Sequence, residues 1–308
     1  MAERQGGVFS RRQAVASGYT PKQIRARLHD GRWVRIRHGQ YAEALDTTGV
    51  EPWVLARQDH LRLVHAAVNA RRTAAVAISH QSALALHGLP LWGLDLSCVH
   101  ITRRDDTTSG TVAGVHHHAG GLADADLTRV GGLVTTTAAR AVFETACTTS
   151  FEAAVVSFDA ALRDCSISAA DVRRLLDATA YWPGSATARA ALNFADLRSE
   201  SVGESRMRVL FADHGLPAPE LQVEFHDARG FVARVDFFIA EFNTVVEFDG
   251  RLKYAGSSSE VLVQEKIRED RLRALGLEVV RADWTDFHRP ERLLTDIRSA
   301  FARSGRAA

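Results

Sequence analysis

Cysteine is scarce in this chain. Its 308 residues include only Cys98, Cys147 and Cys165, which are widely spaced and form no Cys-x-x-Cys pair. An odd, dispersed set of this kind excludes the disulfide framework of a small secreted domain. We therefore expect a protein of the reducing cytoplasm.

Long apolar runs are missing as well. No apolar stretch approaches the ~18 residues that a membrane-spanning helix needs. The N-terminal residues MAERQGG contain no apolar segment of the kind found in a secretion signal. The chain also has no GxSxG, no P-loop and no GxGxxG after a strand. We expect no membrane partner and a bacterial-style cytoplasmic protein.

Lysine is the third scarcity. Of 38 basic residues, only Lys22, Lys253 and Lys266 are lysines. Arginine stays charged in proteins, whereas lysine is a compact charge whose pKa can shift on burial. Each lysine in such an arginine-rich chain is therefore a candidate for a chemical role.

Net charge is also small, at +1, so bulk charge identifies no partner. Its distribution is more informative, because residues 1–41 hold nine Arg or Lys against two acids, Glu3 and Asp30. A basic block within a neutral chain suggests a local anionic partner.

Length and hydrophobic content predict several domains. A chain of 308 residues that is 46% hydrophobic is too long for one typical domain. We predict an α/β multi-domain protein with a winged helix-turn-helix at 1–46, a mixed α/β middle domain at 50–184, and an αβββαβ domain at 199–308.

The N-terminal pattern predicts two short helices and a hairpin. Ser10 can cap a helix to about Ser17, and Thr20 followed by Pro21 opens a helix over 21–29. Residues 32–41 alternate basic with apolar residues around a turn at Gly39. This order is typical of a winged helix-turn-helix.

The basic side chains of this segment are candidates for phosphate contacts on duplex DNA, and the alternative is a solvated surface. Trp33 and Tyr41 are expected in the core. The candidate DNA-binding residues are Arg11, Arg12, Lys22, Arg25, Arg27, Arg32, Arg35 and Arg37.

The middle region predicts helices and strands but no role. We expect helices over 53–70, from Ser79 to His87-Gly88, and over 137–147, 151–164 and 168–178, with strands over 96–102 and 112–118. His116, His117 and His118 look like a metal tract. In a strand, however, only His116 and His118 share a face, and no Cys or acid lies at ligand spacing. We interpret the tract as a partly exposed strand end.

The last region predicts a helix, three strands, a helix and a strand. Their expected ranges are 201–214, 221–226, 231–239, 244–249, 261–275 and 277–282. The step from Val246 to Val280 should be a parallel crossover.

Carboxylates cluster on this predicted sheet. A hairpin turn centred on Glu241 and Phe242 places Asp236 opposite Glu247, with Cβ atoms roughly 5 Å apart. Asp249 lies two residues farther along, on the same face. Three such acids repel one another unless a cation is present, and oxygen ligands favour Mg²⁺ or Mn²⁺. A one-residue slip of register would separate Asp236 from Glu247.

Other groups could complete this cluster. Glu204 on the preceding helix could add a fourth carboxylate, and Lys253 or Lys266 could position an attacking water or stabilise developing charge. Simpler roles stay open. Glu204 fits a Ser-x-x-Glu capping box, Lys253 and Lys266 fit a plain loop and helix surface, and Asp249 fits a turn before Gly250. The carboxylates themselves could be ordinary strand residues facing solvent.

The C-terminal motifs resemble PD-(D/E)XK nucleases over roughly residues 199–295. The likeness is strongest to a subfamily of unknown function related to very-short-patch mismatch-repair endonucleases. It rests on Val235-Asp236-Phe237, on Val246–Tyr254, on Glu265–Leu272, on Gly276 and on Val280–Trp284. The resemblance implies a metal-dependent phosphodiesterase core in which Asp236 and Glu247 are metal ligands and Glu204 is the helix carboxylate.

This chain departs from the superfamily's E-x-K motif. Asp249 stands at the lysine position, and Lys253 occupies a place where related subfamilies carry histidine. The resemblance thus leaves the catalytic lysine displaced.

The N-terminal residues resemble the winged helix of AbiEi-type antitoxins. The likeness rests on Gly7–Ala14, Gly31–Arg35, Gly39 and Tyr41, and continues more weakly through Ser79–Ala83, His87–Leu89 and Thr135–Ala146. Those antitoxins bind DNA and repress their own operon, so the resemblance implies a DNA-binding module.

Two functions follow as hypotheses. One is a Mg²⁺-dependent DNA endonuclease or nickase in phage defence or repair. The other is a non-enzymatic DNA-binding regulator or antitoxin with a degenerate nuclease fold, in a toxin-operon context. Nothing in the sequence excludes an RNA target, although a winged helix favours duplex DNA.

Overall fold

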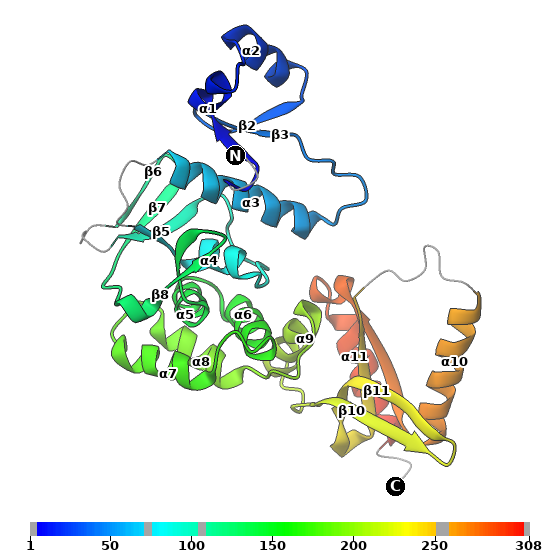
Figure 1. The fold of residues 1–308 in the computed structure, drawn as a ribbon. Helices are drawn as coiled ribbons and strands as arrows, with labels where there is room; N and C mark the ends of the chain where they lie inside the picture. Colours follow the sequence, from blue (N-terminus) through cyan, green and yellow to red (C-terminus); the bar gives the residue numbers. More distant parts are fainter. Residues whose placement is uncertain (1–4, 71–75, 104–108, 251–258, 305–308) are drawn as a thin grey trace. The chain divides into compact units, whose positions relative to one another are not determined.

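The structure is a computed structural model that describes residues 5–70, 76–103, 109–250 and 259–304. The chain divides into two compact units, Met1–Phe194 and Ala195–Ala308. Both mix helices with sheets, as the predicted α/β class requires (Figure 1). The further division of the first unit at residues 46–50 stays a prediction.

The first unit begins with two helices and a small sheet. Strand order is β1-β3-β2, with antiparallel pairing. The helix starts are as predicted, because the hydroxyls of Ser10 and Thr20 accept from the backbone N–H of Gln13 and Gln23 in capping boxes. Strand β1 was not predicted. The elements are β1 (Val8–Ser10), α1 (Arg11–Ala16), α2 (Pro21–His29), β2 (Trp33–Arg37) and β3 (Gln40–Glu43).

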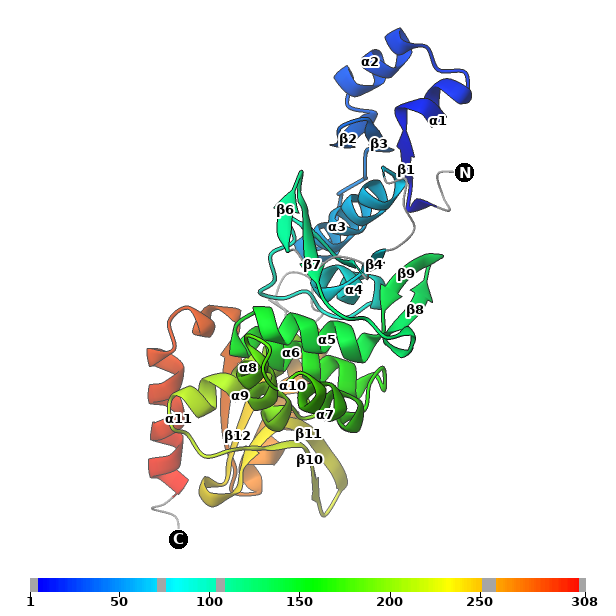
Figure 2. The same cartoon turned by 90° about the vertical axis from the view of Figure 1, so that its left-hand side faces the viewer.

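A small aromatic core holds these elements together. Trp33 and Tyr41 are 4% and 6% exposed and pack with Ala14 and Ile24, so their predicted core placement is confirmed. The next helix, α3 (Pro52–Asn69), packs against the small sheet through Ala66 (Figure 2).

A six-stranded sheet forms the centre of the first unit. Its order is β6-β7-β5-β4-β9-β8, with β5 parallel to β7 and β4 parallel to β9. Only β5 and β7 were predicted from the sequence, and short β4, β6, β8 and β9 were missed. The strands are β4 (Val76–Ile78), β5 (Val99–Arg103), β6 (Gly110–Val112), β7 (Val115–Ala119), β8 (Leu127–Val130) and β9 (Leu133–Thr136).

Helices complete the first unit. The predicted end of α4 at Gly88 is confirmed by a left-handed φ of 87°. The helices are α4 (His80–His87), α5 (Ala138–Thr148), α6 (Phe151–Arg163), α7 (Ala169–Ala178) and α8 (Ser185–Phe194), with a 3-10 turn η2 (Asp124–Asp126).

The second unit has the predicted αβββαβ order, followed by a helix that was not predicted. Its sheet order is β10-β11-β12-β13, antiparallel except for the parallel pair β12 and β13. The elements are α9 (Val202–Asp213), β10 (Glu220–Asp227), β11 (Gly230–Ile239), η3 (Ala240–Phe242), β12 (Thr244–Asp249), α10 (Ser259–Ala274), β13 (Glu278–Asp283), η4 (Trp284–Phe287) and α11 (Glu291–Ser304).

Helices cover both faces of this sheet (Figure 1). Met207 of α9 and Ile297 of α11 pack with Phe237 on one face. Leu272 of α10 packs with Val245 on the other. Because side chains alternate along β12, Glu247 and Asp249 share the face of Val245 and meet α10.

Candidate functional site

The predicted hairpin register is confirmed in the second unit. Ile239 pairs with Thr244, and Phe237 pairs with Val246. Continuing this register places Asp236 opposite Glu247, as the sequence predicted. The Asp236 carboxylate accepts a hydrogen bond of 2.8 Å from the backbone N–H of Phe248, which ties β11 to β12 at this point.

Two arginines, Arg268 and Arg281, contact Glu247. Arg268 of α10 contacts both oxygens of Glu247, at 3.3 Å from Nη1 to Oε2 and more closely from Nη2 to Oε1. Arg281 is the parallel neighbour of Glu247 in β13, and its Nη2 lies 3.9 Å from Oε2 of Glu247. Glu247 is only 7% exposed, so this pairing is largely shielded from water.

Arg281 also joins the remaining acids of this face. Its guanidinium contacts Asp249 at 3.3 Å, Glu265 at 2.8 Å and Glu269 at 3.1 Å. Glu265 also accepts from Arg268 at 3.1 Å. The result is one connected network of carboxylates and two guanidinium groups.

Lys266, one of the two predicted catalytic lysines, forms no ion pair with the described residues of this network. Lys266 is exposed and forms an ion pair of 3.2 Å with Asp270, four residues on, in agreement with the predicted shared face. Arg268 follows it by two residues, about 200° around the helix, so α10 presents Arg268 to Glu247 and turns Lys266 away. The expected catalytic role of Lys266 is not supported by this placement. Lys253 lies outside the described residues.

Glu204 is placed by the start of α9. Its carboxylate accepts from the Glu200 backbone N–H at 2.8 Å, the Ser201 hydroxyl at 2.7 Å and the Gln222 side chain at 3.0 Å. Ser201 caps the helix, as predicted. Three donors satisfy this carboxylate, which favours a structural role for Glu204 beside Asp236.

A glycine lets α9 approach the sheet. A Cβ built on Gly203 would lie 1.9 Å from the ring of Phe248 in β12. Only a residue without a side chain permits this approach. Gly203 therefore determines how close Glu204 comes to the carboxylates of the sheet.

Burial shifts the pKa values of the carboxylates of this site upward. Burial raises the pKa of Glu247, against the opposing effect of Arg268 and Arg281. Burial likewise raises the pKa of Asp236, although the Phe248 N–H and Arg268 favour its ionised form. The pKa of Glu204 is also raised by burial, and nearby Asp236 adds to that shift. Groups of acids with shifted pKa values occur at functional sites and also in structural ion-pair networks.

The expected metal requirement is not supported by this geometry. We predicted that mutual repulsion would call for a bound cation, but Arg268 and Arg281 already supply positive charge. Within the described part of the chain, the only three possible ligands whose atoms approach within 4.8 Å of one another are His80, His100 and His118. Glu204, Asp236 and Glu247 do not converge in this way.

The N-terminal segment presents a second candidate surface. Six of its eight predicted contact residues are exposed: Arg32, which pairs with Asp30, and the five residues Arg11, Arg12, Lys22, Arg25 and Arg35. Arg11 and Arg12 begin α1, Lys22 and Arg25 share a face of α2 at i,i+3 spacing, and Arg35 lies on β2. None of the five forms an ion pair within the described ranges, so their charge faces solvent.

The other three arginines serve internal contacts. Arg27 lies over the rings of Tyr19 and Trp33, at 5.1 Å and 5.4 Å. Arg32 pairs with Asp30. Arg37 donates to the carbonyl of Ala113, and burial lowers its pKa. These contacts favour a structural role over phosphate binding for this subset.

Sequence reasoning missed Arg268 and Arg281. The signal for Arg281 was present, because a parallel β12–β13 register with Val246 beside Val280 places it next to Glu247. Spacing on α10 also places Arg268 on one face with Glu265, Glu269 and buried Leu272. The scarcity of lysine directed attention to Lys266 instead.

Comparison with known proteins found similarity for residues 1–44 and, separately, for a 184-residue part of the chain. Residues 1–44 match a family model described as "Transcriptional regulator, AbiEi antitoxin". Two curated proteins of Mycobacterium tuberculosis, uncharacterized protein MT2308 of strain CDC 1551 / Oshkosh and uncharacterized protein Rv2248 of strain ATCC 25618 / H37Rv, are each 33% identical over 184 residues. The alignment covers 59% of this chain and 66% of each relative. None of the helices in the described ranges is long and apolar enough to cross a membrane. Residues 1–44 of this chain are therefore similar to the AbiEi antitoxin family of transcriptional regulators.

Proposed function

We propose that this protein is a DNA-binding transcriptional regulator of the antitoxin type, which binds duplex DNA through a winged helix-turn-helix formed by residues 1–46. The observation that carries this proposal is the match of residues 1–44 to the AbiEi regulator family. The order β1-α1-α2-β2-β3, with basic residues exposed on both helices and the hairpin, supports it.

The exposed charges suggest how the duplex is bound. Helix α2 is the second helix of the pair, which enters the major groove in helix-turn-helix proteins. Lys22 and Arg25 would then follow the groove edge, while Arg35 on the hairpin would contact the adjacent backbone. Contacts of this kind are mainly to phosphate, so affinity should fall steeply as salt rises.

The test is binding of the full chain to DNA from upstream of its own gene over a series of salt concentrations. Replacing Arg25 and Arg35 together by glutamine should weaken binding and lower the magnitude of the log–log salt slope by about 2, one per lost phosphate contact. Arg174→Gln removes one exposed charge from α7 and serves as the control. Salt-independent binding, or equal slopes in all variants, would contradict the proposal.

A second candidate function is metal-dependent DNA cleavage by the second unit. It is favoured by the αβββαβ order together with Asp236 and Glu247 at the predicted register. Carboxylate oxygens suit Mg²⁺ or Mn²⁺. However, Arg268 already contacts both oxygens of Glu247, so the residues fit such an ion poorly.

Plasmid cleavage distinguishes the two functions. Supercoiled plasmid is incubated with the protein and Mg²⁺ or Mn²⁺, in parallel with Asp236→Ala. Nicking that needs the metal and is lost in Asp236→Ala would make the nuclease the function of the second unit. No nicking, together with tight binding to upstream DNA, would support the regulator.

A further inference from the structure

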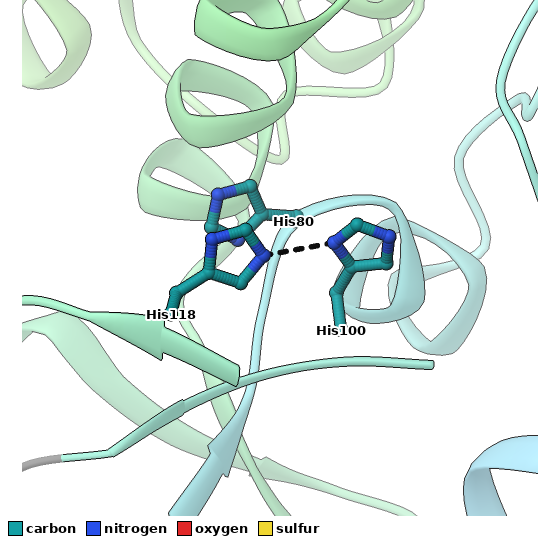
Figure 3. A group of neighbouring side chains, drawn as sticks. All are labelled: His80, His100 and His118. Atoms are coloured by element: carbon teal, nitrogen blue, oxygen red, sulfur yellow. Dashed lines mark hydrogen bonds between the residues drawn. The ribbon is translucent and has the colours of Figure 1, made fainter. Parts of the chain in front are cut away.

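Four histidines from three distant segments gather in the first unit. His80 is the first residue of α4, His100 lies in β5, and His116 and His118 lie in β7. The rings of His80 and His118 stack with centroids 3.6 Å apart, and those of His100 and His118 are 5.1 Å apart (Figure 3). The tract is partly exposed near the end of β7, as interpreted from the sequence, but its histidine neighbours come from α4 and β5, which spacing along the sequence did not reveal.

We propose that His80, His100 and His118 form a binding site for a zinc ion. One ring nitrogen from each residue lies within 4.8 Å of one from each of the others. The site lies in the first unit and involves none of the residues assigned to DNA binding or to the carboxylate network.

The spacing of the nitrogens suits such an ion after small side-chain rotations. Nδ1 of His100 and Nε2 of His118 are 2.8 Å apart (Figure 3). Zinc–nitrogen bonds of about 2.0–2.1 Å in a tetrahedral site separate neighbouring ligand nitrogens by about 3.3 Å. The His100–His118 pair must open slightly, and His80 must turn out of its stack to direct a lone pair toward the same point.

The protonation of the rings suits metal binding. Metal ligation requires neutral imidazole with a free lone pair. Burial lowers the pKa of His100 to about 4, and burial with neighbouring His100 lowers that of His118 to about 3. The pKa of His80 is also held well below its usual value by burial. The shifts of all three rings favour the neutral form that a metal ion requires.

The contacts of Nδ1 indicate which nitrogen of His80 would bind the ion. Its Nδ1 lies 3.1 Å from the Ser79 hydroxyl and 3.6 Å from a carboxylate oxygen of Glu144. In metal sites a ligating histidine commonly directs its second nitrogen to a carboxylate, which orients the ring. This leaves Nε2 of His80 for the ion. Glu144 is itself held by Arg140, whose Nε donates at 2.8 Å.

A change in one amide frees His100 for the ion. The Gln81 amide nitrogen lies 2.8 Å from Nε2 of His100 and donates to the carbonyl of Asp95 at 3.2 Å, while its buried oxygen has no hydrogen-bond partner. In that arrangement Nδ1 of His100 carries the proton and donates to His118. Rotation of the amide brings its oxygen to Nε2 of His100, at the expense of the bond to Asp95. The proton then moves to Nε2, and Nδ1 is free to ligate.

The backbone conformation of His80 is consistent with a functional role for this residue. Its φ of 51° lies in the left-handed region, which is uncommon for residues other than glycine, although histidine adopts it more often than most, and which costs conformational free energy. This conformation starts α4 with the His80 ring turned among the strands. Strain of this kind is concentrated at ligand-binding and catalytic positions.

The donor set selects the class of ion. Imidazole nitrogens suit zinc, copper and nickel, whereas Mg²⁺ and Ca²⁺ prefer oxygen ligands. A zinc ion with three histidines keeps a fourth position for water. The histidine site should therefore bind zinc and not magnesium. A site formed by the carboxylates of the second unit would instead prefer magnesium.

The experiment is zinc titration of the full chain after treatment with a chelator, by calorimetry and by competition with a chromophoric chelator. We expect one zinc per chain with a dissociation constant below about 1 µM, unaffected by millimolar Mg²⁺. His118→Gln and His100→Gln should each weaken binding by more than the roughly 10- to 100-fold that loss of an outer hydrogen bond costs. His117→Gln is the matched control, because neighbouring strand residues point to opposite faces.

Cobalt provides a second readout. Co²⁺ in a tetrahedral nitrogen site should give intense visible absorption in the unsubstituted chain that is lost in His118→Gln. Asp236→Ala should keep full zinc binding. No stoichiometric zinc binding by the unsubstituted chain, or zinc binding in His100→Gln and His118→Gln as tight as in the unsubstituted chain, would overturn the proposal. The first measurement uses the unsubstituted chain, so its outcome does not depend on whether a variant folds.

Discussion

Arg268→Gln should destabilise the second unit by leaving a buried carboxylate without its main partner. The side chain of Glu247 is 9% exposed and that of Arg268 is 29% exposed. Breaking a buried ion pair from one side costs about 3–5 kcal/mol. Arg281, at 3.9 Å, still offsets part of the Glu247 charge, so we expect a loss of about 2–3 kcal/mol at pH 7.

The loss should depend on pH in a defined direction. The pKa of Glu247 is already raised by burial, and removal of Arg268 raises it further. A carboxyl whose folded pKa exceeds its unfolded value destabilises the fold where it is ionised, and this effect vanishes as pH falls below the unfolded value. The cost of Arg268→Gln should therefore be larger at pH 7 than at pH 5.

Hydrogen exchange read by mass spectrometry is the appropriate assay, because it reports the opening of β11 and β12 within the full chain. Glu247→Gln is the partner variant, and the double variant completes a cycle. The double variant should be more stable than the sum of the single losses predicts. A loss below about 0.5 kcal/mol for Arg268→Gln, the range of ordinary surface changes, would refute the reasoning that Glu247 depends on this guanidinium.

Two further predictions concern other positions. Gly203→Ala should cost about 1–3 kcal/mol in the exchange-derived stability of the second unit, because the new Cβ overlaps the ring of Phe248. Gly250→Ala, whose Cβ would sit at 3.7 Å, should be near neutral, and equal effects would argue against the clash. His60 is 1% exposed, and burial lowers its pKa below 6.5, so its contribution to stability is present above pH 6.5 and lost as pH falls. Urea unfolding at pH 7.5 and pH 5.5 should thus show a smaller pH dependence for His60→Gln than for His38→Gln, and identical dependence in both would contradict this.

Local signals predicted most of the helices and strands of this protein. Thr20 and Pro21 begin α2, and Ser201 caps α9, because capping depends on a few neighbouring residues. The register of β11 and β12 was predictable for the same reason, since the short turn between them leaves little freedom in pairing. Three-residue strands such as β4 and β6 carry too little pattern to be recognised.

Contacts between distant parts of the chain determined the chemistry of the carboxylate network and of the histidine cluster. The sequence alone placed Asp236 beside Glu247, but the approach of α10 determined that Arg268, and not Lys266, meets them. The histidine cluster depends on β5 lying beside β7 and on the start of α4 reaching both. Sequence periodicity describes one element at a time, whereas the contacts of Arg268 with Glu247 and those among the histidines join residues of different elements. Local chemistry therefore determined the elements, and their packing determined which charges and ligands face one another.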